Sequence, residues 1–592
     1  MGRLRYAARL LAVLALVLTP LASHAEPQST QALLAEAREA LRREDGIAAE
    51  MKLRAALAQG MPRERVAALM GSAYLRQGDR QSAREWVAPG VFSPDTRAEG
   101  FRVLGWIEQQ DRHLDAAMRA YDRALAAAPN DADLWIEIAR LRDRRGEHTL
   151  ALQAGDRAMA IDPRNVRALE FRGDVVRDRF GLLASLPWYE SALAKAPGDV
   201  SVLIRHAATL GDLGRATEAL VATRRLLQVK PGNPQAYYLQ AVLAGRARRY
   251  DLARQLLART RGKLDTLPGV MLVSAASELS AGNTQTAAEL CERLLQRDPT
   301  NMPARQLLAR ALYLSEQYRY LTLRFADDIA RGDASPYLLT IVARGFEAIG
   351  NRLQAGELLD RAALPAKAAL RVVPKGSVVG ALMAQGRSQE ALAAAANDLA
   401  AHPGSYAAQS LAGDVQLATG RALAAQRRYA AAARIRMTDS LLQRRFEAFA
   451  GTGNLRAAAQ MVQGYLLQNP ANRVALRLQA TLAVRAGDSP RAGAILDHLR
   501  RAGGDGDVQL LMDSALVQLN LGEDAAAQQA ADQAYRMQRA SPVAAQMLAL
   551  SYATTGVKPG QVRSLLAKAR QMIGDNPILA ETTRRLGERR PA

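Results

Sequence analysis

Apolar positions recur along this chain with a period of 34 residues, most clearly between positions 98 and 199. In three successive blocks, a large residue stands at position 4 and small residues stand at positions 20 and 27, with position 8 also small and position 24 mostly aromatic. The residues at these positions are Phe101, Trp135 and Leu169; Gly105, Ala139 and Gly173; Ala117, Ala151 and Ser185; Tyr121, Gly155 and Tyr189; and Ala124, Ala158 and Ala192. The pattern predicts two packed helices in each block.

Prolines mark the end of each block. Pro129, Pro163, Pro197 and Pro231 are spaced by 34 residues, and proline cannot continue a helix interior, so each is expected to end the second helix. We expect position 8 of the first helix to meet position 20 of the second helix at their closest approach. If Trp135 fills the space beside this contact, its replacement by alanine should cost about 3–5 kcal/mol.

This arrangement of large, small and aromatic positions, closed by proline at position 32, resembles the tetratricopeptide repeat family. The resemblance implies an all-α fold, a right-handed superhelical solenoid of about sixteen helix-turn-helix units. Each unit contacts only its neighbours, so 592 residues need no single globular core. The composition agrees, because alanine and leucine dominate and aromatic residues make up only 5%.

The phase of the repeats divides the chain into five segments. They are a targeting segment (1–25), degenerate or capping repeats (26–97), the first half of the array (98–371), its second half (372–577), and a capping helix with a basic tail (578–592). The stretch Leu364–Pro374 contains two prolines and no clear repeat signal. It is interpreted as a bend between the two halves.

The N-terminus has the pattern of a secretory signal. Arg3, Arg5 and Arg9 precede the short apolar run Leu10–Leu18, and small residues flank a cleavage point after Ala25. The prediction is a mature protein in the bacterial periplasm with no transmembrane segment. The alternative is an uncleaved anchor, although the run is shorter than the ~20 residues that span a bilayer.

The formal charge of +21 comes almost entirely from arginine. A basic surface concentrates anionic partners; the alternative is solvated helix faces that carry many i,i+4 ion pairs. The single cysteine, Cys291, stands at position 24 of its block, so a buried thiol is expected.

No catalytic constellation is present in the sequence. The histidines are scattered, and no pair has the His-Glu-x-x-His zinc spacing. There is no Gly-x-Ser-x-Gly elbow and no complete phosphate-binding loop. We expect no enzyme, no metal site and no cofactor.

The resemblance to tetratricopeptide repeats also implies a binding surface, because positions 2, 5, 9, 12 and 13 of each first helix line a concave groove in that family. Carried over to this register, these positions hold Arg102, Trp106, Arg140, Arg144, Arg177, Tyr238, Arg246, Arg310, Tyr313 and Arg344. Arginine suits carboxylates and phosphates, and exposed aromatic rings suit sugars or peptide anchors. The alternative is that these side chains pair with neighbouring acids and contribute little.

Two functions from different classes fit these features. The first is a non-enzymatic periplasmic scaffold that binds proteins of the cell envelope, with anionic polysaccharide as a further partner and no nucleic acid. The chain resembles large repeat proteins of exopolysaccharide systems in its signal peptide, its long repeat array and its basic charge. The second is a periplasmic chaperone or adaptor for secretion or outer-membrane assembly, which grips extended segments through apolar pockets.

Overall fold

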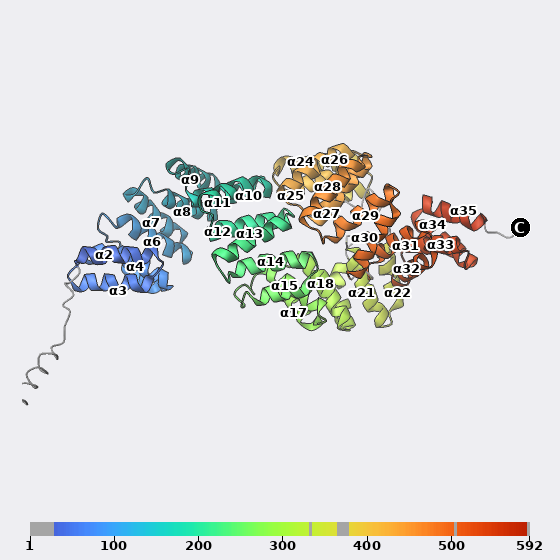
Figure 1. Cartoon of the computed structure of the whole chain (residues 1–592), viewed down its shortest axis with the longest axis horizontal. Helices are drawn as coiled ribbons and strands as arrows, with labels where there is room; N and C mark the ends of the chain where they lie inside the picture. The colour runs from blue at the N-terminus through green and yellow to red at the C-terminus, as the bar shows by residue number, and fades with distance from the viewer. Residues whose placement is uncertain (1–28, 331–333, 364–377, 503–505, 589–592) are drawn as a thin grey trace, which may run out of the picture. The chain divides into compact units, whose positions relative to one another are not determined.

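The chain folds into α-helices that follow one another in pairs (Figure 1). The computed structural model describes residues 29–330, 334–363, 378–502 and 506–588. Within them are thirty-four helices, α2 to α35, and no strand, which confirms the all-α prediction. Two compact units divide at Phe171 and Arg172, inside α10 (Val166–Phe180). Each unit is described by itself.

The first unit, Met1–Phe171, contains eight complete helices among its described residues and the start of α10. These helices are α2 (Thr30–Arg42), α3 (Gly46–Ala58), α4 (Arg63–Gln77), α5 (Arg80–Val87), α6 (Arg97–Gln110), α7 (Leu114–Ala127), α8 (Ala132–Arg144) and α9 (His148–Ile161). The predicted signal, 1–25, lies outside the described residues.

The second unit, Arg172–Ala592, holds the rest of α10 and the later helices. Its earlier helices are α11 (Leu182–Lys195), α12 (Val200–Asp212), α13 (Ala216–Val229), α14 (Pro234–Arg246), α15 (Tyr250–Ala258), α16 (Pro268–Ser280), α17 (Thr284–Arg297), α18 (Met302–Leu314), α19 (Tyr318–Arg324), α20 (Ala326–Ala330), α21 (Pro336–Ala348) and α22 (Arg352–Ala363). The predicted bend at Leu364–Pro374 lies outside the described residues.

The helices that follow are α23 (Val378–Ala384), α24 (Ser388–Ala401), α25 (Tyr406–Ala418), α26 (Ala422–Ile435), α27 (Asp439–Gly451), α28 (Leu455–Gln468), α29 (Arg473–Arg485), α30 (Ser489–Arg501), α31 (Val508–Asn520), α32 (Asp524–Met537), α33 (Pro542–Thr555), α34 (Pro559–Ile573) and α35 (Pro577–Glu588). Among the described helices, sixteen pairs can be counted, with α20 as an extra turn and α35 after the last pair. This agrees with the predicted count of about sixteen units.

The ends of the helices follow from the prolines and the residues after them. Helices α7, α9, α11 and α13 each end two residues before the proline of their block. The intervening residue has left the helical conformation; Ala128, for example, has φ −140° and ψ 71°, since the α region is disfavoured for a residue that precedes proline. Two residues after the proline, an Asp or Asn caps the next helix, as Asp199 does by accepting from Val202 N at 2.9 Å.

The core of each pair lies around positions 20 and 24. Position 20 is fully buried, as at Ala117 and Ser185. The closest approach differs from the expectation, however: a Cβ added at Gly105 would come within 2.7 Å of the Tyr121 ring, which stands at position 24. Glycine at position 8 therefore makes room for the aromatic ring of the partner helix.

Trp135 fills less of the core than the pattern suggests. Its side chain is half-buried, and its indole Nε1 donates to Pro129 O at 3.0 Å. The neighbouring Ile136 and Ile138 are among the fully buried residues of α8. Replacement of Trp135 by alanine should therefore cost less than the loss of a fully buried aromatic residue.

In the second unit, segments about 250 residues apart in sequence touch. Helix α11 contacts α26, and α13 contacts α28. Thr217 Oγ1 donates to Gln468 O at 3.1 Å, and Asn469 Nδ2 donates to Gly214 O. We call this contact, made by residues 214–217 and 465–469, the seam.

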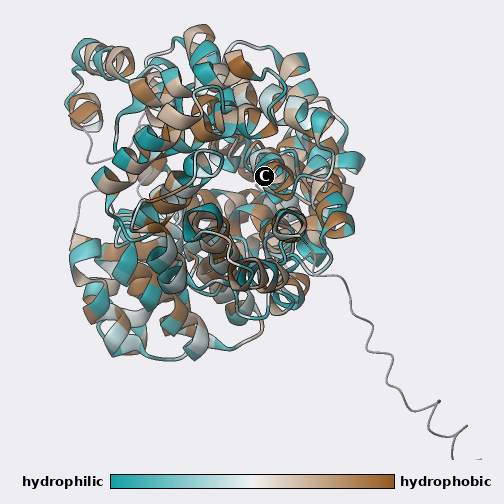
Figure 2. Cartoon of the chain, turned by 90° about the vertical axis from the view of Figure 1, so that its left-hand side faces the viewer, coloured by the Kyte–Doolittle hydropathy of each residue, from teal (hydrophilic) through white to brown (hydrophobic). Residues whose placement is uncertain are grey.

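Most helices carry both apolar and polar residues. In Figure 2, brown and teal segments are mixed along the helices instead of forming long apolar stretches. Among the described residues, none of the helices combines the length and the apolar character that a bilayer crossing requires.

The contact between glycine and tyrosine can be tested at Gly413 in α25. A Cβ there would lie 2.5 Å from the buried Tyr429 ring, so Gly413→Ala should destabilise the protein by about 1–3 kcal/mol through overpacking. Helical Gly464 in α28 has no such neighbour within 4 Å, so Gly464→Ala should stabilise it by about 0.5–1 kcal/mol. Urea denaturation followed by circular dichroism measures both, and equal effects would contradict the packing account.

Candidate functional site

The predicted groove residues all lie on the first helix of their repeats. In the first unit, Arg102 and Trp106 are on α6, and Arg140 and Arg144 are on α8. In the second unit they are Arg177 on α10, Tyr238 and Arg246 on α14, Arg310 and Tyr313 on α18, and Arg344 on α21. Whether they bind a partner stays a prediction.

In the first unit, two of these arginines bind acids of the following repeat. Arg102 makes a two-pronged contact with Glu137 at 2.7–3.0 Å, and Arg140 Nη2 lies 2.7 Å from Glu170 Oε2. The Glu170 side chain is only 5% exposed, so Arg140 compensates a nearly buried charge. The ion pairs connect first helices of successive repeats.

Arg144 and Trp106 remain accessible in the same unit. Trp106 is 37% exposed. Arg144 is exposed, and the described residues offer its guanidinium no hydrogen bond or ion pair. Of the four predicted groove residues in the first unit, these two side chains are the ones without an ion pair among the described residues.

Most of the predicted residues in the second unit have partners within the chain. Arg246 binds Asp212 at 2.9 Å and Gly211 O at 2.6 Å. Arg344 contacts Glu347 and also donates to Met537 O at 2.6 Å, across 193 residues of sequence. These guanidinium groups hold the unit together.

The remaining predicted residues of the second unit also have neighbours. Arg177 Nε lies 3.1 Å from Asp178 Oδ1. The Tyr313 ring packs against Tyr318 with 5.6 Å between centroids. Burial raises the pKa of the Tyr337 hydroxyl, and the nearby Arg310 opposes this rise. Burial also raises the pKa of the Tyr238 hydroxyl.

A buried aspartate with a strongly raised pKa lies in the second unit. Asp414, at position 9 of its repeat on α25, is 1% exposed and accepts from the Tyr429 hydroxyl at 2.8 Å. Arg444 of α27 lies 3.0 Å from its other oxygen. Burial raises the pKa of Asp414 to about 7, although Arg444 and Tyr429 lower it and Glu447 adds a further upward contribution.

The same arrangement occurs at Asp174. The Tyr189 hydroxyl donates to it at 2.7 Å, and Arg205 of the next repeat lies 3.2 Å away. The sequence analysis did not identify this arrangement. The signal that would have found it is the dipeptide Gly-Asp at positions 8 and 9, followed by tyrosine at position 24, which recurs at Gly413. The aspartate, tyrosine and arginine together link neighbouring repeats, and the aspartate has its partners within the chain.

The cysteine prediction is confirmed. Cys291 lies on α17 and is fully buried in the hydrophobic core between the helices. Burial, followed by the charge of Glu292, raises the pKa of its thiol to about 12. A thiol held protonated in this way is a poor nucleophile.

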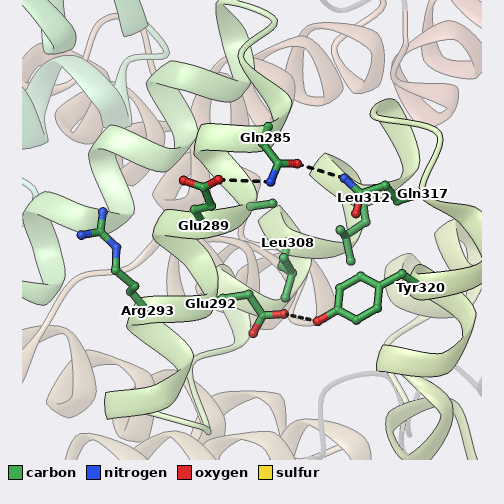
Figure 3. Close-up of a pocket in the computed structure, with 9 residues that line it drawn as sticks. Gln285, Glu289, Glu292, Arg293, Leu308, Leu312, Gln317 and Tyr320 are labelled. Carbon is green, nitrogen blue, oxygen red and sulfur yellow. Dashed lines mark hydrogen bonds between the residues drawn. The ribbon is translucent and has the colours of Figure 1, made fainter.

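An open pocket of about 570 Å³ lies over α17, α18 and α19 (Figure 3). Its floor is apolar and its rim is polar. The Tyr320 hydroxyl donates to Glu292 at 3.3 Å, and Gln317 donates to Gln285 at 3.0 Å. Arg324 also binds Glu292 at 3.0 Å, so this carboxylate is already compensated. The pocket can accept a side chain, and its described lining contains no nucleophile paired with a base.

A protein-family model described as a tetratricopeptide repeat matches residues 278–319, which contain α17 and α18. Residues 278–319 thus match a tetratricopeptide repeat, and the described chain as a whole is an all-α array of helix pairs. The matched family is a helical repeat, and no enzymatic family is indicated. No curated protein matches the sequence. Among the described residues, no cluster of three or more potential metal ligands occurs.

Several solved structures resemble the solenoid. The Cut9–Hcn1 hetero-tetramer of APC/C is similar over 94% of this chain and 96% of the other, with 13% identity and a TM-score of 0.43. PilF of Pseudomonas aeruginosa covers 36% of this chain and 98% of its own length, with 19% identity and a TM-score of 0.33. PilW, a type IV pilus biogenesis factor, has 18% identity over 36% of this chain and 98% of its own, with a TM-score of 0.31. These similarities assign no function.

The pKa of Asp414 gives a prediction for stability. The folded pKa of about 7 exceeds the ordinary value near 3.8, so the folded state binds the proton more tightly between these values. The stabilisation that this bound proton gives the folded state is present at low pH and is lost as pH rises through about 7. From pH 7 to pH 5, the opening free energy of α25–α27 should rise by about 2 kcal/mol relative to Asp414→Asn.

Hydrogen exchange of α25–α27 at fixed temperature measures this difference, because it reports local opening in a long array. The Asp414→Asn variant is the matched control, since it keeps the shape of the side chain and removes its titration. A wild-type profile parallel to that of the variant would contradict the raised pKa.

Proposed function

We propose that this protein is a non-enzymatic scaffold that binds protein partners through the first helices of its repeats. The observation that carries the proposal is the accessible pair Trp106 and Arg144 on successive first helices of the first unit. Tryptophan and arginine are the residue types that dominate binding energy at protein interfaces. A helical repeat array supplies an extended surface for such contacts.

The internal ion pairs favour a protein partner over a simple polyanion. Arg102, Arg140 and Arg246 already bind carboxylates, so the surface presents both signs of charge. A uniformly anionic polymer would have to compete with these acids. A protein surface can match alternating charges.

We further propose that the scaffold works in the bacterial periplasm, as part of an envelope assembly that exports or assembles polysaccharide. The support is the basic and apolar pattern of Arg3 to Leu18 and the small residues before Glu26. The rival function, a periplasmic chaperone or adaptor, predicts many unrelated clients instead of one assembly.

The periplasmic proposal makes a direct prediction. In a Gram-negative host, the mature protein should fractionate with the periplasm, and its N-terminal peptide should begin at Glu26 by mass spectrometry. A chain that retains Met1 and sediments with the inner membrane would support an uncleaved anchor and overturn the soluble periplasmic location.

In-cell crosslinking of the tagged chain, followed by mass spectrometry, tests the scaffold. A defined set of envelope proteins should be recovered, and Arg144→Glu should reduce its yield about tenfold. Arg119→Glu on α7 is the control, because Arg119 is equally exposed but lies on a second helix. The charge reversal is placed at Arg144 because reversal of Arg140 would set two acids together at Glu170.

The crosslinking result separates the two rival functions. Recovery of a polysaccharide synthase or export porin supports the scaffold, whereas recovery of many unrelated secreted proteins supports the chaperone. Loss of capture on added salt indicates a contact made by exposed charges. Equal capture by wild type, Arg144→Glu and Arg119→Glu would show that the partner binds elsewhere.

A further inference from the structure

A partly open cavity of about 420 Å³ lies at the seam of the second unit. One wall comes from α13, α14 and α15, and the other comes from Gln468–Asn472, at the turn between α28 and α29. The cavity therefore exists only where the two distant segments meet. It lies apart from the open pocket over α17 to α19.

The floor of this cavity is apolar. Leu220, Leu243, Leu252 and Leu256 line it, together with Ala244. Leu256 and Ala244 are buried, and the other three are half-buried. A floor of this composition gains free energy when an apolar side chain displaces water from it.

The rim carries cations without acids. Arg224 and Arg249 line the cavity and are exposed, and within the described ranges neither guanidinium has a hydrogen bond or an ion pair. Most arginines of the first-helix surface are, in contrast, bound to carboxylates. These two arginines are suited to a carboxylate that comes from outside the chain.

Further positive charge lies nearby. Arg248 precedes Arg249 at the turn between α14 and α15, and Arg473 begins α29. Burial and then the charge of Arg248 lower the pKa of Arg473, whereas the charge of Asp507 raises it. Like charges therefore face each other across the two segments with Asp507 as a partial compensation, and a further anion between them would relieve the remaining repulsion.

We propose that this cavity binds an acidic peptide segment of a partner protein, in which an apolar side chain is flanked by carboxylates. The apolar side chain enters the leucine floor, and the carboxylates bind Arg224 and Arg249. The proposal rests on the protein-binding function above and adds a second surface, away from the predicted groove residues except Arg246. Because the ligand touches both walls, its binding strengthens the seam.

Three fluorescein-labelled decapeptides provide the probes: alternating Glu and Leu, alternating Glu and Ser, and alternating Lys and Leu. By fluorescence anisotropy with the purified chain, the Glu-Leu peptide should bind about tenfold more tightly than either of the others. Equal binding of the Glu-Ser peptide would overturn the role of the apolar floor. Equal binding of the Lys-Leu peptide would overturn the role of the arginines.

The double variant Arg224→Glu/Arg249→Glu should bind the Glu-Leu peptide about tenfold or more weakly than wild type does. Arg225→Glu is the matched control, because Arg225 is exposed on the same helix and does not line the cavity. Its affinity should stay within about twofold of wild type, since an exposed charge outside the site contributes little. Equal weakening by both variants would show a general charge effect and overturn the site.

Hydrogen exchange supplies a second readout. The Glu-Leu peptide should slow exchange in residues 216–224 and 468–472 together, and protection of only one segment contradicts a shared cavity. The crosslinking experiment keeps the two proposals distinguishable. If partners are captured through Arg144 but no decapeptide binds, this inference fails alone; if no partner is captured, the scaffold fails.

Discussion

The burial of one helix pair by the next is the contact on which the rest of this structure depends. No pair closes its own core: position 6 of one repeat, such as Phe171, approaches position 24 of the preceding repeat, Gly155, so closely that a Cβ there would lie 2.8 Å from the ring. Because every pair relies on its neighbours, stability is passed along the array. The prolines and caps then set where each helix begins and ends, so that these contacts stay in phase.

Charged side chains also pair between neighbouring repeats. The basic excess of the chain suggests a surface of free cations, yet arginines such as Arg102 and Arg444 reach acids of the adjacent repeat. At Asp414 the acid is buried, so the pair both links repeats and makes their contact depend on protonation. In this positively charged solenoid, the arginines that can bind an anionic partner are therefore the few without an acid partner among the described residues.

Much of the fold could be predicted from sequence because it is repeated. The spacing of Pro129 and Pro163 and the small residues at position 20 were enough to predict helix pairs, their ends and their approximate number. The contact at Gly105 was assigned to the wrong partner, since small size at position 8 does not say which atom fills the space. Trp135 was overrated because the indole can satisfy its N–H at the preceding turn and remain half exposed.

The candidate surfaces were harder to predict. Family positions placed Arg144 and Arg344 together as groove residues, but only a structure shows that Arg344 is held by Met537 O. The cavity at the seam had no signal in sequence, because its walls are about 250 residues apart and share no periodic pattern. Contacts of this kind depend on the accumulated rotation of many repeats, which no single block encodes.

The seam also limits how this chain can change. Solenoids commonly tolerate the gain or loss of a whole repeat, because each unit meets only its neighbours. Here Gly214 and Asn469 meet across 255 residues, so one repeat added or deleted between them would bring a different turn opposite Gly214. The contact at the seam thus fixes the number of repeats between α13 and α28. Natural variation in length should be confined to the regions outside that interval.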